Sequence, residues 1–134
     1  MSQAEVPAQN RSAAPAGRIR QVCRDYLARV SSDDPGSAAD LYAADAVLED
    51  PVGSAPIRGR DRIRAFYRDN AGGVTLALAG PLVVCGREAA LRLAAEARRA
   101  GRVHRLDVID VLRFDDACRI TSLRAYCTPP FAAA

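Results

Sequence analysis

Apolar residues recur at helical spacing from position 18 onward. They form one stripe, with charged residues between its members, at Ile19, Val22, Cys23, Tyr26, Leu27 and Val30. This spacing predicts an amphipathic helix that ends near Ser31. Turn residues at 33–36 then lead into a second short helix, with Ala38, Leu41 and Tyr42 on one face.

Strand-like patterns dominate the rest of the chain. Residues 46–50 predict a short strand, and prolines and glycines at 51–59 mark a loop before a third helix at 61–70, with Ile63, Phe66 and Tyr67 inward. Four strand-length segments follow, at 74–84, 87–99, 103–115 and 119–128. Helices followed by consecutive strands predict an α+β fold, with helices packed on the concave face of a mostly antiparallel sheet.

The segment 88–100 fits two interpretations. Its alanine, leucine, arginine and glutamate residues favour a helix by intrinsic propensity. Its apolar residues nevertheless alternate with charged ones, as a half-buried strand requires. We therefore predict a strand, with a helix as the alternative.

Length and composition predict one soluble globular domain. The 134 residues are 49% hydrophobic and 26% charged, and no apolar run is long enough to span a membrane. Residues 1–17 are rich in alanine, proline and small polar residues, so we expect a flexible leader before a single domain at 18–134.

Charge and cysteine usage exclude several classes of function. The net charge of +3 comes from scattered arginines, which argues against a nucleic-acid partner. The four cysteines lack C-x-x-C spacing and His104 is the only histidine, so neither a metal site nor a disulfide framework is supported. A reducing, cytoplasmic location fits this pattern best.

Asp110 is a candidate for unusual acid–base chemistry. Alternation along 106–114 places it on the same strand face as Leu106, Val108, Leu112 and Phe114, which should be buried. A carboxylate there is either paired or protonated with a raised pKa, because burial disfavours its charged form. The alternative is a purely structural acid that bonds to backbone or to an arginine.

Three tyrosines are expected to point into the same interior. Tyr26, Tyr42 and Tyr67 each lie on the apolar face of a predicted helix. Each one alone is a core residue by default, since a buried phenol only needs a hydrogen-bond partner. Together with a buried aspartate, they suggest a polar site inside an apolar cavity.

Asp50 is the third candidate. It ends a predicted strand, and Pro51 holds it extended and so denies it a helix-capping role. An acid at a sheet edge is ordinarily solvated, and Glu49 competes with it as a catalytic acid. The pattern of residues alone leaves this choice open.

Three segments resemble bacterial Δ5-3-ketosteroid isomerases of the NTF2-like, SnoaL-like superfamily. They are DYLARV with Tyr26, DLYAADAVLEDPVGS with Asp50, and DVIDVLRFD with Asp110. The resemblance spans roughly 19–128 and implies a conical fold, with a six-stranded curved sheet and three helices. It also implies a homodimer that works without a cofactor on a small hydrophobic, steroid-like substrate.

The resemblance implies a role for each candidate residue. Asp50 would be the base that moves a proton, Tyr26 and protonated Asp110 the donors to the developing oxyanion, and Tyr42 and Tyr67 the supports of Tyr26. The implied substrate pocket consists of Val30, Val52, Phe66, Leu91, Leu93, Val111, Leu123 and Cys127. Leu91, Leu93 and Cys127 stand where some relatives carry aromatic residues or methionine, which implies a differently shaped pocket.

Two other functions fit the same fold. One is an epoxide hydrolase or polyketide cyclase of a biosynthetic pathway, and the absence of a glutamate from 74–80 counts against it. The other is a non-catalytic protein that binds a hydrophobic ligand. Neither of these alternatives explains the combination of Tyr26, Asp50 and Asp110 as simply as an isomerase does.

Overall fold

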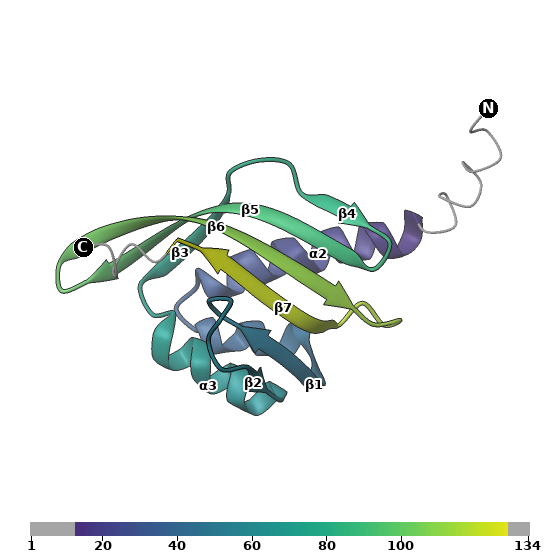
Figure 1. Ribbon diagram of the computed structural model, residues 1–134, viewed down its shortest axis with the longest axis horizontal. Helices are drawn as coiled ribbons and strands as arrows, with labels where there is room; N and C mark the ends of the chain where they lie inside the picture. Colours follow the sequence, from purple (N-terminus) through teal and green to yellow (C-terminus); the bar gives the residue numbers. More distant parts are fainter. Residues whose placement is uncertain (1–12, 129–134) are drawn as a thin grey trace.

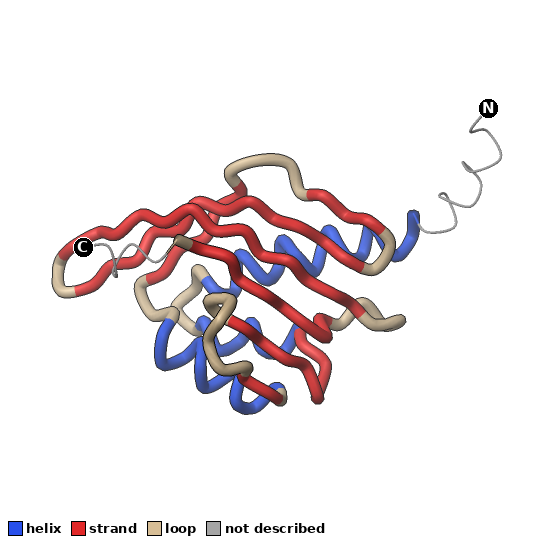
Figure 2. The backbone as a smooth tube through the Cα atoms, viewed as in Figure 1, coloured by secondary structure: helices blue, strands red, loops and turns tan. Residues whose placement is uncertain are grey.

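The computed structural model describes residues 13–128, which form three helical segments and one seven-stranded sheet (Figures 1 and 2). In chain order these elements are α2 (Ala13–Val30), η2 (Pro35–Leu41), β1 (Tyr42–Glu49), β2 (Ile57–Arg58), α3 (Arg60–Asn70), β3 (Val74–Leu78), β4 (Val83–Cys85), β5 (Glu88–Arg99), β6 (Arg102–Phe114) and β7 (Ile120–Cys127). The three helices lie together on one side of the sheet (Figure 1).

The sheet is mostly antiparallel, as predicted. Its strand order is β2-β1-β7-β6-β5-β3, and β4 pairs with the N-terminal end of β5. Among the strands of residues 13–128, only the β1–β7 pair is parallel. The predicted α+β conical architecture is therefore confirmed. The five strands predicted from the pattern become seven, because residues 74–84 form two strands rather than one and because the two-residue β2 adds to β1.

The apolar stripe of α2 is buried as predicted. Ile19, Cys23, Tyr26, Leu27 and Val30 are all at most 9% exposed. They pack with Ile63 and Tyr67 of α3 against leucines of the sheet. Burial of a large apolar side chain contributes roughly 1.5–3 kcal/mol, so this stripe fixes the helix over the sheet. No helix in the described part of the chain is long and apolar enough to cross a membrane.

The ambiguous segment 88–100 is a strand. Burial alternates along β5, with Ala89, Leu91, Leu93, Ala95 and Ala97 inward. Twelve residue pairs join β5 to β6, from Glu88 with Arg113 to Arg99 with Arg102. Helix propensity is outweighed because a helix would bury charged residues that the strand leaves exposed.

Several predicted boundaries were wrong. Helix α2 begins at Ala13, so the last five residues of the predicted leader are helical, while residues 1–12 lie outside the described residues. The second helix is a 3₁₀ segment that ends at Leu41, and Tyr42 already belongs to β1. Gly80 and Pro81 interrupt the segment 74–84, because proline lacks the N–H that a continuous strand would use.

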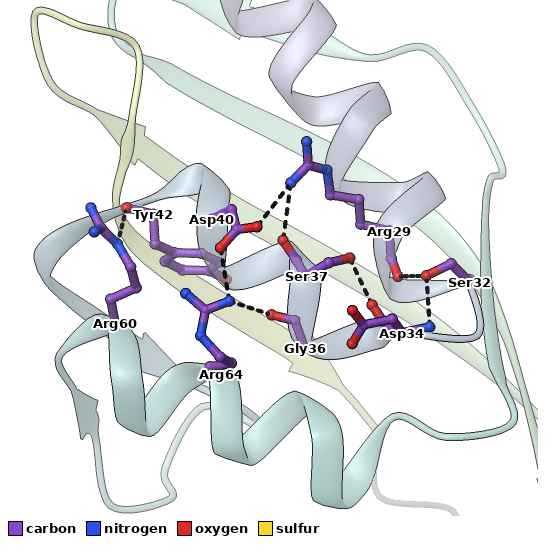
Figure 3. A network of polar contacts seen from close by, with 9 residues as sticks. All are labelled: Arg29, Ser32, Asp34, Gly36, Ser37, Asp40, Tyr42, Arg60 and Arg64. Carbon is purple, nitrogen blue, oxygen red and sulfur yellow. Dashed lines mark hydrogen bonds and ion pairs between the residues drawn. The ribbon is translucent and has the colours of Figure 1, made fainter.

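A polar network holds η2 between α2 and α3 (Figure 3). Asp40 accepts from Arg64 at 2.8 Å and pairs with Arg29 at 3.5 Å. Arg29 also donates to the carbonyl of Ser37 at 3.1 Å, and Arg60 of α3 donates to the carbonyl of Tyr42 at 2.9 Å. These contacts fix the start of β1 and with it the direction of the Tyr42 ring.

Candidate active site

A cavity of about 270 Å³ lies between the helices and the sheet. It brings together Tyr26 from α2, Tyr67 from α3, Asp110 from β6 and Asp50 from the loop after β1. Val30, Phe66 and Cys127 also line it, as the resemblance implied. Residues far apart in the sequence thus meet in one largely apolar space, which is typical of a small-molecule site.

Asp110 is the one charged residue among the described residues that is fully buried. It is 2% exposed and shares its strand face with Leu112 and Phe114, as the alternation predicted. Burial raises the pKa of its carboxyl group to about 7, the negative charge of Asp50 adds to the rise, and the hydrogen bond from Tyr26 acts against it. Near neutral pH a substantial fraction of Asp110 is therefore protonated and can donate a hydrogen bond.

Hydroxyl groups connect the three predicted tyrosines to Asp110. Tyr26 donates to Oδ2 of Asp110 at 3.3 Å, and Tyr67 donates to Tyr26 at 3.5 Å. The hydroxyls of Tyr42 and Tyr67 lie 2.6 Å apart, and because Tyr67 has only one proton, Tyr42 is the donor of this bond. The chain of donation therefore runs from Tyr42 through Tyr67 and Tyr26 to Asp110.

The tyrosines stay protonated in this setting. Burial raises the pKa of Tyr26, Tyr42 and Tyr67 well above the usual value of 10, and the nearby Asp110 charge adds to the effect for each of them. The bonds at 3.3 and 3.5 Å are longer than ordinary O–H···O bonds, whereas the 2.6 Å bond is short. Tyr42 and Tyr67 are thus held tightly, and Tyr26 is free to turn its proton toward a closer acceptor.

Asp50 lines the same cavity and is held there by β7. Glu49 is in register with Arg124, and the backbone N–H of Val52 donates to the carbonyl of Ala125 at 2.8 Å. Ala125 is in turn opposite Asp110 across β6 and β7. Burial raises the pKa of Asp50, and no other described residue donates a hydrogen bond to its carboxylate. A carboxylate without a partner is a competent proton acceptor.

Glu49, the competing acid, is already paired. It accepts from Arg124 at 2.9 Å and from the backbone N–H of Gly53 at 3.2 Å. The hydrogen bond from Arg124 lowers the pKa of Glu49, and the bond from Gly53 lowers it further. Alternation along the strand directs Glu49 away from the side to which Leu48 is buried, so it does not line the cavity. The two neighbouring acids therefore have different surroundings: Glu49 is paired with Arg124, and Asp50 lines the cavity.

Five predicted pocket residues lie elsewhere. Leu91, Leu93 and Leu123 are at most 1% exposed in the core and do not line the cavity. Val111 is on the opposite sheet face from Asp110, because adjacent residues of a strand point in opposite directions. Val52 lines an adjoining open hollow, beside Ile109 and Tyr126, which shares Val108 and Cys127 with the cavity.

Smaller residues form the cavity wall in their place. Ala95 and Ala97 of β5 and Leu106 and Val108 of β6 line it. Leu91 is paired with Asp110, so the cavity extends from that level toward the β5–β6 turn rather than toward Leu91. Asn70 and Arg99 line its other end and were not anticipated. Alternation from Ala95 through Ala97 to Arg99 is the sequence signal that could have found Arg99.

The arrangement suits proton transfer at a carbon next to a carbonyl group. Two hydroxyl donors 3.3 Å apart can both reach one oxygen atom, and a free carboxylate faces the same space. Among residues 13–128, no cluster of three or more histidine, cysteine, aspartate or glutamate side chains could hold a metal ion.

The chain is similar to known proteins over most of its length. The family model described as SnoaL-like domain matches residues 23–123. A steroid Delta-isomerase from Nocardioides simplex is 36% identical over 116 residues, covering 85% of this chain and 93% of that protein.

A solved structure supports the fold. It belongs to SalBIII, an epoxide hydrolase/cyclase-like enzyme with a role in pyran ring formation in the polyether salinomycin. Its TM-score is 0.78 at 23% identity, with 86% of this chain and 94% of that chain covered. From the family match, the isomerase relative and the fold together, the chain belongs to the SnoaL-like family of the NTF2-like superfamily, as a relative of the bacterial steroid isomerases.

Proposed function

We propose that this protein is a steroid Δ-isomerase that converts 3-oxo-Δ5 steroids into 3-oxo-Δ4 steroids. The observation that carries the proposal is the 3.3 Å separation of the Tyr26 hydroxyl and the Asp110 carboxyl in a cavity that also holds the unpaired Asp50. The 36% identical steroid Delta-isomerase supports the same reaction class.

The proposed reaction is a transfer of one proton within the substrate. The Asp50 carboxylate removes a proton from C4. The electrons of the C–H bond form a double bond between C3 and C4, and the π electrons of the carbonyl group move onto the C3 oxygen, which gives a dienolate. Tyr26 and protonated Asp110 donate hydrogen bonds to this oxygen as its charge develops. Protonated Asp50 then delivers its proton to C6, which leaves the double bond conjugated with the ketone.

Tyr67 supports this mechanism by occupying a lone pair of the Tyr26 oxygen. Because Tyr67 donates to Tyr26, the Tyr26 proton remains available for the substrate. Tyr42 fixes Tyr67 in the same way at 2.6 Å. The donors are therefore oriented before the reaction starts, which is what makes hydrogen bonds in a dry site effective.

Cofactor requirement, oligomeric state and location are also part of the proposed function. We propose that the reaction needs no cofactor, since the base and both donors are side chains of the chain itself. A homodimer through the outer sheet face is supported by the exposed Ile109 and Tyr126. A cytoplasmic location is supported by Cys23, Cys85, Cys118 and Cys127, none of which forms a disulfide.

The test follows the ultraviolet absorbance of the conjugated enone formed from a 3-oxo-Δ5 steroid. Asp50→Asn should lower kcat by about 10²–10⁴-fold, because it removes the general base. Glu49→Gln is the matched control, since it changes the neighbouring acid that faces away from the cavity, and it should retain activity within a few fold. Equal activity of wild type and Asp50→Asn would refute the assigned base, and no turnover by the folded wild type would refute the reaction.

A further inference from the structure

Arg99 is the only cation among the described residues that line the cavity. The two carboxyl groups of the cavity, Asp50 and Asp110, lie near the Leu91 level of β5, whereas Arg99 is eight residues further along the same strand face. The cavity is therefore electrostatically polar along its length. Its acidic end contains the hydroxyl donors, and its other end contains a fixed positive charge.

The Arg99 guanidinium is anchored by backbone carbonyls. Nη1 donates to the carbonyls of Gly72 at 2.6 Å and Arg98 at 2.8 Å, and Nη2 donates to that of Asn70 at 2.6 Å. The group packs close to Gly73, which has φ of +77°, and a Cβ built there would lie 3.5 Å from Nη1. A side chain at Gly73 would be strained by this φ and by the Arg98 carbonyl oxygen, which would lie 3.2 Å from the Cβ.

Two donors of Arg99 remain after these bonds. A guanidinium has five N–H groups, and the described residues provide acceptors for three of them. The Nε–H and one Nη2–H are left for another acceptor. Asn70, which also lines this end, donates through Nδ2 to the carbonyl of Phe66 at 2.9 Å and has one further N–H.

The geometry points to a substrate with an anionic carboxylate at the end opposite its reacting ketone, recognised by Arg99. This inference rests on the proposed function for the ketone end of the substrate and names the chemistry of the other end. A guanidinium held in place by three carbonyls has lost its rotamer freedom before binding, so pairing with a carboxylate costs little further ordering.

Charge also fixes the direction in which such a substrate enters. A carboxylate beside Asp50 would be repelled by the negative charge of that group, whereas at the other end it meets the positive charge of Arg99. The wall between the two ends is apolar, with Ala95, Ala97, Leu106 and Val108 between Asp110 and Arg99. The inferred substrate lies with its apolar skeleton along this wall, its ketone at Tyr26 and its carboxylate at Arg99.

The test measures binding of two matched product analogues by calorimetry. The probes are 3-oxoandrost-4-ene-17β-carboxylate and the corresponding primary carboxamide, which is similar in size but neutral. Wild type should bind the carboxylate at least tenfold more tightly than the amide. Arg99→Gln should lose this preference and keep its affinity for the amide within threefold.

Two further variants separate recognition from folding and from general charge. Arg98→Gln removes the same charge from the adjacent residue, which does not line the cavity, and should keep the preference. Arg99→Lys retains the positive charge and should keep part of the preference for the carboxylate. This variant tests the inference even if Arg99→Gln unfolds. Equal affinities in wild type, or a preference that persists in folded Arg99→Gln, would overturn the inference.

The outcome is distinguishable from failure of the proposed function. Selective binding of the carboxylate without any isomerisation would uphold the role of Arg99 and refute the reaction. Isomerisation without selectivity for the carboxylate would uphold the reaction and refute the role of Arg99. If Arg99→Gln weakens both ligands equally, Arg99 serves only to hold the end of α3, and the inference is wrong.

Discussion

Asp50 and Asp110 are two carboxyl groups in one cavity with different surroundings. Asp110 is enclosed on an apolar strand face, and the pKa of its carboxyl rises to about 7 through burial and the charge of Asp50. The pKa of Asp50 is also raised by burial, but no neighbouring negative charge contributes to its shift. Asp50 therefore ionises first, and between the two pKa values one group is a base while the other is a donor.

The first prediction concerns the pH dependence of the reaction. In wild type, kcat/KM should rise as Asp50 ionises and fall above about pH 7 as Asp110 loses its proton. Asp110→Asn keeps an N–H donor but cannot titrate, so the fall at high pH should disappear and activity near pH 6 should drop by about tenfold or more. An unchanged alkaline limb in the variant would mean that Asp110 does not control it.

The second prediction concerns stability. The pKa of Asp110 is 3.8 in an unfolded chain and about 7 in the fold, so between these values the folded state binds one more proton than the unfolded state. The stabilising contribution is complete below pH 3.8 and is lost as pH rises toward 7. The free energy of unfolding of wild type should thus fall, relative to Asp110→Asn, by about 1 kcal/mol per pH unit across this window.

Urea denaturation from pH 4 to pH 8 measures this difference. The comparison with Asp110→Asn cancels the contribution of the surface acids, which both proteins share. A difference that is constant across the window would show that the Asp110 pKa is not raised in the folded protein.

Strand register, rather than any single residue, determines where the cavity lies. Pairing of Leu91 with Asp110 and of Ala125 with Asp110 places three strands around the buried acid. The cavity then opens toward Ala95 and Ala97, where small side chains leave space. Helices α2 and α3 cover this space with the side chains of Tyr26, Phe66 and Tyr67.

Much of this arrangement could be predicted from the sequence. Period-two alternation correctly placed Asp110 on the inner face, and helical spacing correctly placed Tyr26 and Tyr67 inward. The resemblance assigned Leu91, Leu93 and Leu123 to the pocket, although they are core residues that do not line the cavity. Alternation alone could not correct this assignment, because it does not reveal how far one strand is shifted against the next.

The pattern of residues also could not decide whether Glu49 or Asp50 is the acid that lines the cavity. This choice depends on the parallel pairing of β1 with β7, which brings Arg124 to Glu49 and leaves Asp50 facing the cavity. Val111 shows the opposite case, because the alternation that placed Asp110 inward already implied that Val111 points outward. That error came from the resemblance and was avoidable.

The third prediction tests the chain of hydroxyls that links the helices to β1. Tyr67→Phe removes the donor to Tyr26, so the Tyr26 proton loses its orientation and kcat should fall by about tenfold with little change in KM. Tyr42→Phe is the matched control, because it leaves the Tyr67–Tyr26 bond in place and should cost less activity.

Tyr42→Phe removes one buried hydrogen bond and should lose about 1 kcal/mol of stability, whereas Tyr67→Phe removes two and should lose about 2 kcal/mol. Measuring kcat and the free energy of unfolding side by side distinguishes orientation from simple loss of packing. Equal loss of activity in the two variants would contradict the proposed direction of hydrogen-bond donation, from Tyr42 through Tyr67 to Tyr26.

The described part of the molecule has two layers, with the helices on one face of the sheet and the other face of the sheet uncovered (Figure 1). The outer face carries Ile109 and Tyr126, which are 46% and 41% exposed. Exposed apolar side chains that lie together mark an interface more often than a free surface. Proposed dimerisation through this face leaves the mouth of the cavity, on the other side of the sheet, accessible.

The fourth prediction follows from this arrangement. Sedimentation should give the mass of two chains for wild type and of one chain for Ile109→Glu, because the charge would be buried in the interface. Val83→Glu is the control: Val83 is 55% exposed on the short strand β4, and the change should leave the dimer intact. A monomeric wild type, or a dimeric Ile109→Glu, would contradict the proposed interface.

In the proposed reaction, the Asp50 carboxylate carries the same proton from C4 to C6. The fate of deuterium tests this step: a 3-oxo-Δ5 steroid labelled at C4 is converted in ordinary water, and the product is examined by nuclear magnetic resonance. We expect the conjugated enone with deuterium recovered at C6. Enone without any label at C6, or no enone at all, would refute the proposed transfer by Asp50.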